Sequence, residues 1–142
     1  MTEKVLLVDD EKDFVEALGE RMKNRGMNVT TTTSAKDAIN KVTAESYDAI
    51  VLDLQMPEMD GMEALKVIKE IKPEMQIILL TGHATVEKGI KAIKMGAMDL
   101  IEKPADMQTI IEKIKKAQAK KMILVEKKTE MKIKKIMSSK GW

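Results

Sequence analysis

The 142-residue sequence contains no cysteine, which excludes a disulfide framework and a metal site made of thiolates. No apolar run approaches the roughly 20 residues that span a membrane. Residues 1–4 lead directly into an apolar segment, so we expect no signal peptide. These absences predict a cytoplasmic protein with no membrane partner.

Aromatic residues are also scarce, at 2% of the chain, and charge is unevenly spread. Residues 112–142 hold 11 Lys and 3 Glu, a net charge of +8. Residues 1–111 hold 14 Lys plus Arg and 20 Asp plus Glu, a net charge of −6. An acidic body therefore precedes a basic tail. Because the tail has no arginine and almost no aromatic residue, we do not expect a nucleic-acid partner.

What is present is a regular alternation of strand-like and helix-like segments. Five short segments rich in apolar or β-branched residues predict strands at Val5–Val8, Met27–Thr33, Ala49–Asp53, Ile77–Leu80 and Asp99–Glu102. Apolar residues at helical spacing follow each strand, with helix boundaries indicated at Gly26, Ser34, Pro73, Gly96 and Asp106. The alternation predicts an α/β fold with a parallel sheet, and the doubly wound order 2-1-3-4-5 suits five strands.

The strand ends carry the residues that we expect to be functional. Asp53 ends a strand that is otherwise small or apolar, at the edge of the sheet where α/β proteins bind ligands. In the order 2-1-3-4-5 the first and third strands are neighbours, which brings Asp9 and Asp10 close to Asp53. Thr81 and Lys103 follow the fourth and fifth strands and lie on the same edge.

Clustered carboxylates repel one another, and a hard divalent cation resolves the repulsion. Mg²⁺ prefers oxygen ligands, so we expect it to bind Asp10, Asp53 and the backbone carbonyl of Gln55. Asp9 would bind the cation through a water molecule, or would contact the direct ligands without binding the cation itself. With the cation in place, the Asp53 carboxylate can attack a phosphoryl group. The cation, the Lys103 ammonium and the Thr81 hydroxyl would each stabilise one phosphoryl oxygen.

These motifs resemble the receiver domains of bacterial two-component response regulators. Six motifs at strand ends and turns carry the resemblance, which covers about residues 3–120: Val8-Asp9-Asp10, Leu52-Asp53, Met56-Pro57, Asp60-Gly61, Thr81-Gly82 and Lys103-Pro104. The resemblance implies a flavodoxin-like (βα)5 fold and a phosphoaccepting switch that is not an enzyme. It also implies phosphotransfer to Asp53 from a histidine kinase or a phosphotransfer protein, and a cis peptide bond between Lys103 and Pro104.

The same resemblance implies roles for four further positions. Gln55 and His83 would flank the path of the attacking water and set the phosphoryl lifetime, although His83 also fits an exposed loop residue. Thr81 would act as the switch with Leu100, which stands where such receivers usually carry Tyr or Phe. We therefore expect activation to appear mainly as a shift of the helix around residues 86–95, which contains Gly89 and is followed by Gly96.

Two other functions stay open at this point. A phosphohydrolase with an aspartyl-phosphate intermediate would want a second acid two residues after its nucleophile, where this chain has Gln55. A receiver fragment of a transcriptional regulator is the other alternative, because the loop at residues 81–86 resembles that of enhancer-binding activators. The sequence names neither the kinase nor the downstream protein.

The last helix is predicted to continue past the receiver, so we divide the chain into a receiver at 1–120 and a basic helical extension or tail at 121–142. An apolar stripe supports the helix, and its members are Ile111, Ile114, Gln118, Met122, Val125, Thr129, Ile133 and Ile136. The stripe could pack against a twin helix in a homodimer or against an acidic partner. A disordered Lys-rich end, with Trp142 unpacked, is the alternative.

Overall fold

The computed structural model describes residues 2–139 and confirms the predicted fold. A five-stranded parallel sheet has the order β2-β1-β3-β4-β5. The strands are β1 (Lys4–Val8), β2 (Asn28–Thr32), β3 (Ala49–Asp53), β4 (Ile77–Thr81) and β5 (Asp99–Glu102). The helices are α1 (Lys12–Lys23), α2 (Ala35–Ala44), α3 (Gly61–Ile71), α4 (Val86–Lys94) and α5 (Met107–Ser139).

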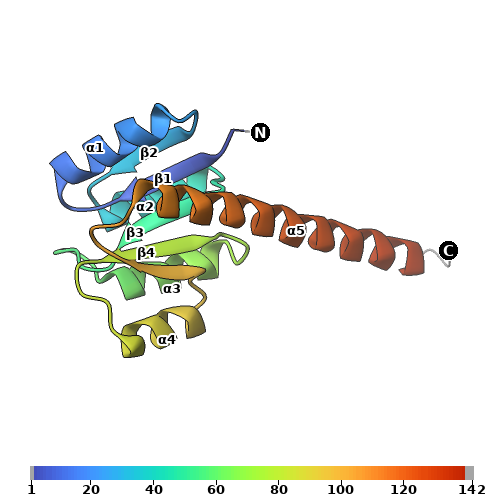
Figure 1. Ribbon diagram of the computed structural model, residues 1–142. Coiled ribbons are helices and arrows are strands. Elements are labelled where there is room, and N and C mark those ends of the chain that lie inside the picture. The colour runs from blue at the N-terminus through green and yellow to red at the C-terminus, as the bar shows by residue number, and fades with distance from the viewer. Residues whose placement is uncertain (1, 140–142) are drawn as a thin grey trace.

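Helices cover both faces of the sheet (Figure 1). One core packs α2, α3 and α4 against alternate strand residues such as Leu6, Leu52 and Leu79. The other core packs α1 and α5 against the residues that point the opposite way, such as Leu7 and Val51. Because both faces are buried, the central strands are apolar along their length, which explains why they are recognisable in the sequence.

Several helix boundaries follow from local chemistry. The Ser34 hydroxyl accepts a hydrogen bond from the Asp37 N–H at 3.2 Å, and the Thr85 hydroxyl caps α4 in the same way at 3.1 Å. Past the ends of α1 and α4, Gly26 and Gly96 have φ values of 90° and 103°, which a residue with a side chain rarely adopts. The turns that return the chain to the sheet are therefore encoded locally.

Helix α4 is the most weakly buried of the helices on its face. Its apolar residues Val86, Ile90 and Ile93 are exposed, Val86 by 79%, and only Ala92 is buried. The apolar spacing predicts the helix, and the helix exists, but the stripe itself does not face the core.

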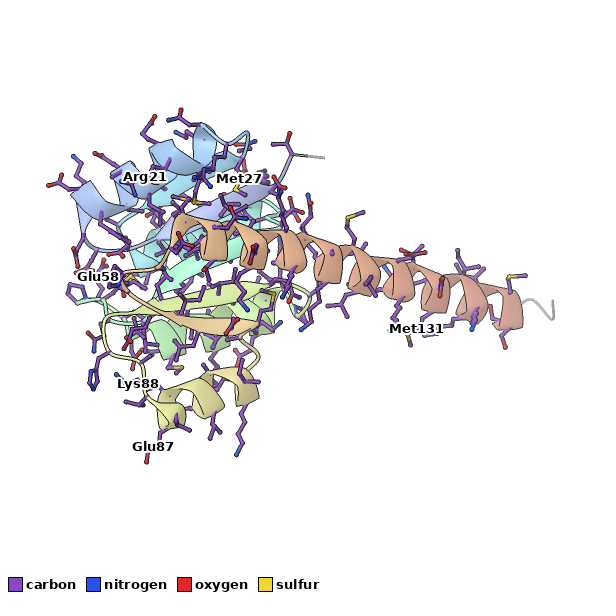
Figure 2. The ribbon with its side chains drawn as sticks, in the orientation of Figure 1. Arg21, Met27, Glu58, Glu87, Lys88 and Met131 are labelled. Atoms are coloured by element: carbon purple, nitrogen blue, oxygen red, sulfur yellow. The ribbon has the colours of Figure 1, made fainter. Side chains whose placement is uncertain are left out.

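Helix α5 continues far beyond the sheet (Figure 1). Its buried residues end at Ala117, and Gln118 and Lys121 make its last hydrogen bonds with the body. The Gln118 amide lies 3.4 Å from Asp48 Oδ2, and Lys121 Nζ donates to Ser46 Oγ at 2.6 Å and to the Tyr47 carbonyl at 2.7 Å. Residues 122–139 are helical and exposed, as Met131 illustrates in Figure 2. The predicted extended helix is therefore confirmed as far as Ser139, and Trp142 lies outside the described residues.

Among residues 2–139, no helix is long and apolar enough to cross a membrane.

Candidate functional site

The carboxyl ends of four adjacent strands form the site. Val8 pairs with Leu52 in the sheet, so Asp9 lies beside the end of β3, where Asp53 is the last residue. Thr81 ends β4, and Lys103 directly follows β5. The structure thus brings together the residues that the strand order predicts at one edge.

Asp53 is only 5% exposed, although it ends its strand. Its Oδ1 lies 3.7 Å from Lys103 Nζ, and the Gln55 N–H donates to the same oxygen at 3.4 Å. After β3 the chain turns so tightly that Gly61 comes very close to the end of the strand. A Cβ on Gly61 would lie 2.6 Å from the Asp53 carbonyl oxygen and 2.6 Å from Leu54 Cα. Glycine at this position lets the start of α3 approach the backbone that carries Asp53.

Lys103 joins two of the acids. Its Nζ donates to Asp9 Oδ2 at 2.6 Å and forms the longer ion pair with Asp53. Its backbone N–H donates to the Thr81 carbonyl at 2.7 Å, and the peptide bond to Pro104 is cis, as the resemblance implies. Burial opposes the charge of Lys103, but the hydrogen bond to Asp9 and the attraction of Asp53 raise its pKa overall.

Three carboxylates gather where a cation could bind. Oxygens of Asp9, Asp10 and Asp53 lie within 4.8 Å of one another; Asp9 and Asp53 are buried, and Asp10 is exposed. The pKa of Asp53 is raised to about 6, mainly by burial and to a smaller extent by repulsion from the Asp9 carboxylate. Attraction to Lys103 only partly opposes this shift. One ammonium therefore does not balance three carboxylates.

Thr81 is fully buried at the end of β4, and its hydroxyl accepts a hydrogen bond from the His83 N–H at 3.2 Å. The His83 side chain is exposed, as is that of Gln55. Leu100 is half-buried on β5 and packs against the core that includes α4. The structure locates these residues, whereas their roles in switching and in phosphoryl lifetime stay predictions.

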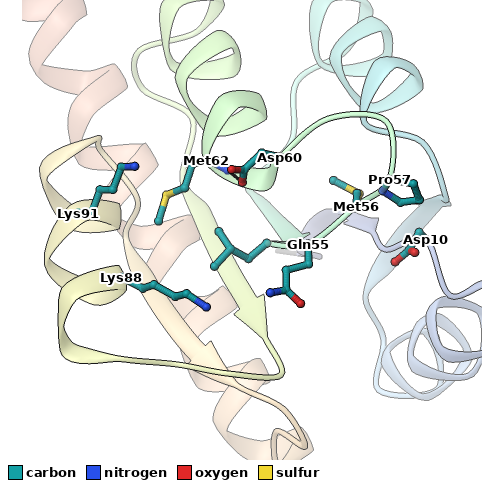
Figure 3. A pocket seen from close by; sticks show the side chains of 9 residues that line it. Asp10, Gln55, Met56, Pro57, Asp60, Met62, Lys88 and Lys91 are labelled. Atoms are coloured by element: carbon teal, nitrogen blue, oxygen red, sulfur yellow. Dashed lines mark hydrogen bonds between the residues drawn. The ribbon is translucent and has the colours of Figure 1, made fainter.

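A cavity of about 560 Å³ opens beside the carboxylates, between the β3–α3 loop and α4. Figure 3 shows Gln55, Met56 and Pro57 on its loop side, with Lys88 and Lys91 reaching toward it from α4. The Lys88 ammonium also donates to the His83 carbonyl at 2.9 Å. The sequence does not single out these lysines, because their position depends on how α4 lies against the sheet.

Phe14 is a further residue that sequence reasoning does not identify as functional. Its position on the apolar stripe of α1 predicts only a core residue, yet its ring centroid lies 4.5 Å from Lys103 Nζ. Only the tertiary structure reveals this contact, because 89 residues separate the two positions in the chain.

Comparisons with known proteins agree with this geometry. The family model described as "Response regulator receiver domain" matches residues 5–115. An NtrX-like response regulator of Rickettsia bellii is 38% identical over 115 residues, which are 80% of this chain and 24% of that protein. The transcriptional regulatory protein ZraR of Salmonella typhimurium is 35% identical, over 81% of this chain and 26% of its own length. The chain thus spans about a quarter of the length of these curated relatives.

Solved receiver structures resemble the whole body of the fold. A receiver domain from Clostridium thermocellum has a TM-score of 0.81 and 32% identity, and the match covers 86% of this chain and 98% of that one. The beryllofluoride-activated NtrC4 receiver domain dimer has a TM-score of 0.78 and 34% identity, with 82% and 97% covered.

Proposed function

Since this chain belongs to the response regulator receiver domain family, we propose that it is a phosphoaccepting switch of a two-component system and that Asp53 is the phosphoacceptor. The observation that carries the proposal is a buried carboxylate at a strand end, between Asp9 and the Lys103 ammonium. The donor in this proposal is the phosphohistidine of a histidine kinase or of a phosphotransfer protein. The proposal also places the protein in the cytoplasm.

The donor atoms of the site fit Mg²⁺. Asp9, Asp10 and Asp53 supply only carboxylate oxygens, and burial together with repulsion from Asp9 raises the pKa of Asp53 despite the nearby Lys103. We assign Asp10, Asp53 and the Gln55 carbonyl as ligands. Asp9 would bind the cation through a water molecule or contact these ligands without binding the cation itself. When bound, Mg²⁺ would neutralise the carboxylates and stabilise charge on a phosphoryl oxygen.

The chain's own residues would carry out the transfer. An oxygen of Asp53 forms a bond to phosphorus while the bond from phosphorus to the donor nitrogen breaks, and the donor imidazole keeps that electron pair. The Lys103 ammonium lies near enough to move from the carboxylates to a phosphoryl oxygen. The buried Thr81 hydroxyl would bind another oxygen and so connect the phosphorylated site to β4.

We propose that the domain signals by changing its contacts and does not turn over a substrate. Gln55, in place of a carboxylic acid, offers no general acid for a leaving alcohol, which disfavours a phosphohydrolase. The output is a separate question. We propose a receiver that acts alone through contacts with other proteins. The alternative is a receiver that forms part of, or acts together with, a transcriptional regulator, and the name of ZraR, a transcriptional regulatory protein, supports this alternative.

The proposed receiver comprises residues 1–120, and residues 121–142 form a basic extension that contacts a partner. Exposed apolar side chains on α5 support this division; they are Met122, Val125, Ile133 and Ile136. A homodimer through this helix is one arrangement. The NtrC4 receiver is described as a dimer, which is a property of that relative.

Labelling with acetyl phosphate and Mg²⁺, followed by peptide mapping, tests the phosphoacceptor. We expect label on Asp53 that disappears in Asp53→Ala and when Mg²⁺ is omitted. Asp37→Asn, on helix α2 and outside the carboxylate cluster, is the matched control and should label like the wild type. Full labelling of Asp53→Ala would overturn the proposal.

A further inference from the structure

The Lys103 ammonium has an aromatic neighbour besides its two carboxylate neighbours. It lies 2.6 Å from Asp9 Oδ2, 3.7 Å from Asp53 Oδ1 and 4.5 Å from the centroid of the Phe14 ring. The last distance is well inside the range of a cation–π interaction, in which the negative face of the ring attracts the cation. Phe14 is the single phenylalanine of a chain whose aromatic content is 2%.

Phe14 is held firmly enough to influence the lysine. It belongs to α1 and packs, half-buried, against the core formed by α1, α5 and the sheet. Its ring also borders a surface groove of about 300 Å³ together with Arg21, Pro104 and Met107. Phe14 therefore borders the groove and also contacts the lysine, and it packs against the core.

We propose that Phe14 is a positioning residue for phosphoryl transfer, which holds the Lys103 ammonium beside Asp9 and Asp53. This inference rests on the proposed function of Asp53. A lysine side chain is a flexible four-carbon stem, so ion pairs with carboxylates alone leave its ammonium considerable freedom. The ring supplies a third attraction and limits the positions of the ammonium before the phosphoryl group arrives. A better placed charge lowers the barrier without requiring contact between Phe14 and the donor.

The contact itself can be measured in the full chain without any donor or metal. Protons near an aromatic face experience the ring current, so the ε-CH₂ protons of Lys103 should resonate upfield of those of exposed lysines. Phe14→Tyr keeps the ring and should keep the upfield shift, whereas Phe14→Leu should abolish it. Lys103 ε-protons at ordinary positions in the wild type would overturn the proposal, whatever the activity of the variants.

Rates of labelling by acetyl phosphate test the consequence. We expect Phe14→Leu to lower the maximal rate by roughly threefold to tenfold, which corresponds to the usual strength of a cation–π contact. The half-saturating donor concentration and the Mg²⁺ affinity should change little, because Phe14 belongs neither to the carboxylate cluster nor to the lining of the cavity beside it. Phe14→Tyr should restore the rate. The control is Met107→Leu, which alters the same groove without removing the ring.

A double-mutant cycle separates positioning from packing. In a Lys103→Met background there is no cation to hold, so Phe14→Leu should cause no further loss of rate. An equal loss in both backgrounds, no loss in either, or a tyrosine variant as slow as the leucine variant would overturn the proposal. These results would leave the proposed function intact as long as labelling still maps to Asp53, so the two failures are distinguishable.

Discussion

Asp53 is a residue at which burial and a neighbouring carboxylate both oppose ionisation, and together they raise its pKa from 3.8 to about 6. The folded chain therefore binds this proton more tightly than the unfolded chain does. The resulting stability is fully present below pH 3.8, and it is lost as the pH rises through about 6. The charged site thus weakens the fold at neutral pH.

We predict that Asp53→Asn stabilises the protein at pH 7.5 in EDTA, by about 1–2 kcal/mol after allowance for solvent screening. The gain should disappear below about pH 4, where the unfolded carboxyl is also protonated. Urea unfolding at the two pH values measures it, and Mg²⁺ should shrink the gain because it binds and stabilises the wild type. Asp37→Asn is the control: a hydrogen bond from Thr32 helps to lower the pKa of Asp37, so this change should not stabilise.

Gln55 and His83 should influence how long the phosphoryl group survives. Both side chains are exposed at the edge of the site, and the His83 N–H is bonded to the Thr81 hydroxyl. We predict that replacing both by alanine opens the path of water and shortens the lifetime severalfold. Loss of label after removal of the donor measures the rate, and equal decay of wild type and variant would show that neither side chain gates water.

The residues at strand ends could be predicted because a buried strand has an apolar sequence and a known direction. Asp53 and Thr81 end such strands and Lys103 follows the shorter edge strand β5, so strand order places the three together. Phe14 could not be predicted in this way, because a residue on an apolar helical stripe has the same pattern whether it meets the core or a lysine. Sequence periodicity shows which face of a helix is apolar, but it does not identify the side chains that this face will contact.

Helix α4 shows the same limit for a whole element. Its apolar residues at positions 86, 90 and 93 satisfy the helical period, yet all three are exposed. The helix lies against β5, a short strand at the sheet edge, and buries only Ala92 in the core. With so little buried surface, α4 is the element that we expect to open and shift most easily.

Gly89→Ala tests the softness of α4. A Cβ at this position would meet only Leu100 Cδ2, at an ordinary contact distance of 3.9 Å. We predict that alanine stabilises the helix by up to about 1 kcal/mol and slows amide exchange over residues 86–95. Lys94→Arg, which keeps a strong helix former, is the control. We also expect beryllofluoride to change exchange there in the wild type and less in the variant, and an unchanged α4 would contradict this.

The molecule as a whole divides its charge between an acidic body and a basic arm. Residues 1–111 carry a net charge of −6, whereas residues 112–139 of α5 hold 10 Lys and 3 Glu, a net charge of +7, of which +3 lies beyond Lys121. The arm leaves the body in a defined direction, because Gln118 and Lys121 bind the loop before β3. Its exposed apolar residues therefore form a surface with a fixed orientation relative to Asp53.

Removing residues 122–142 should test whether this surface associates. The cut keeps Lys121, which still contacts Ser46 and Tyr47, so the body should remain folded. Full burial of a large apolar side chain contributes about 1.5–3 kcal/mol, whereas lysines on two copies repel each other. We therefore predict weak self-association of the full chain that strengthens when salt screens the repulsion, and none of the truncated chain. Ile133→Ser with Ile136→Ser, which keeps the charge, should behave like the truncation. Sedimentation and circular dichroism measure mass and helicity, and a truncation that alters neither would show that the arm is not a helix that pairs.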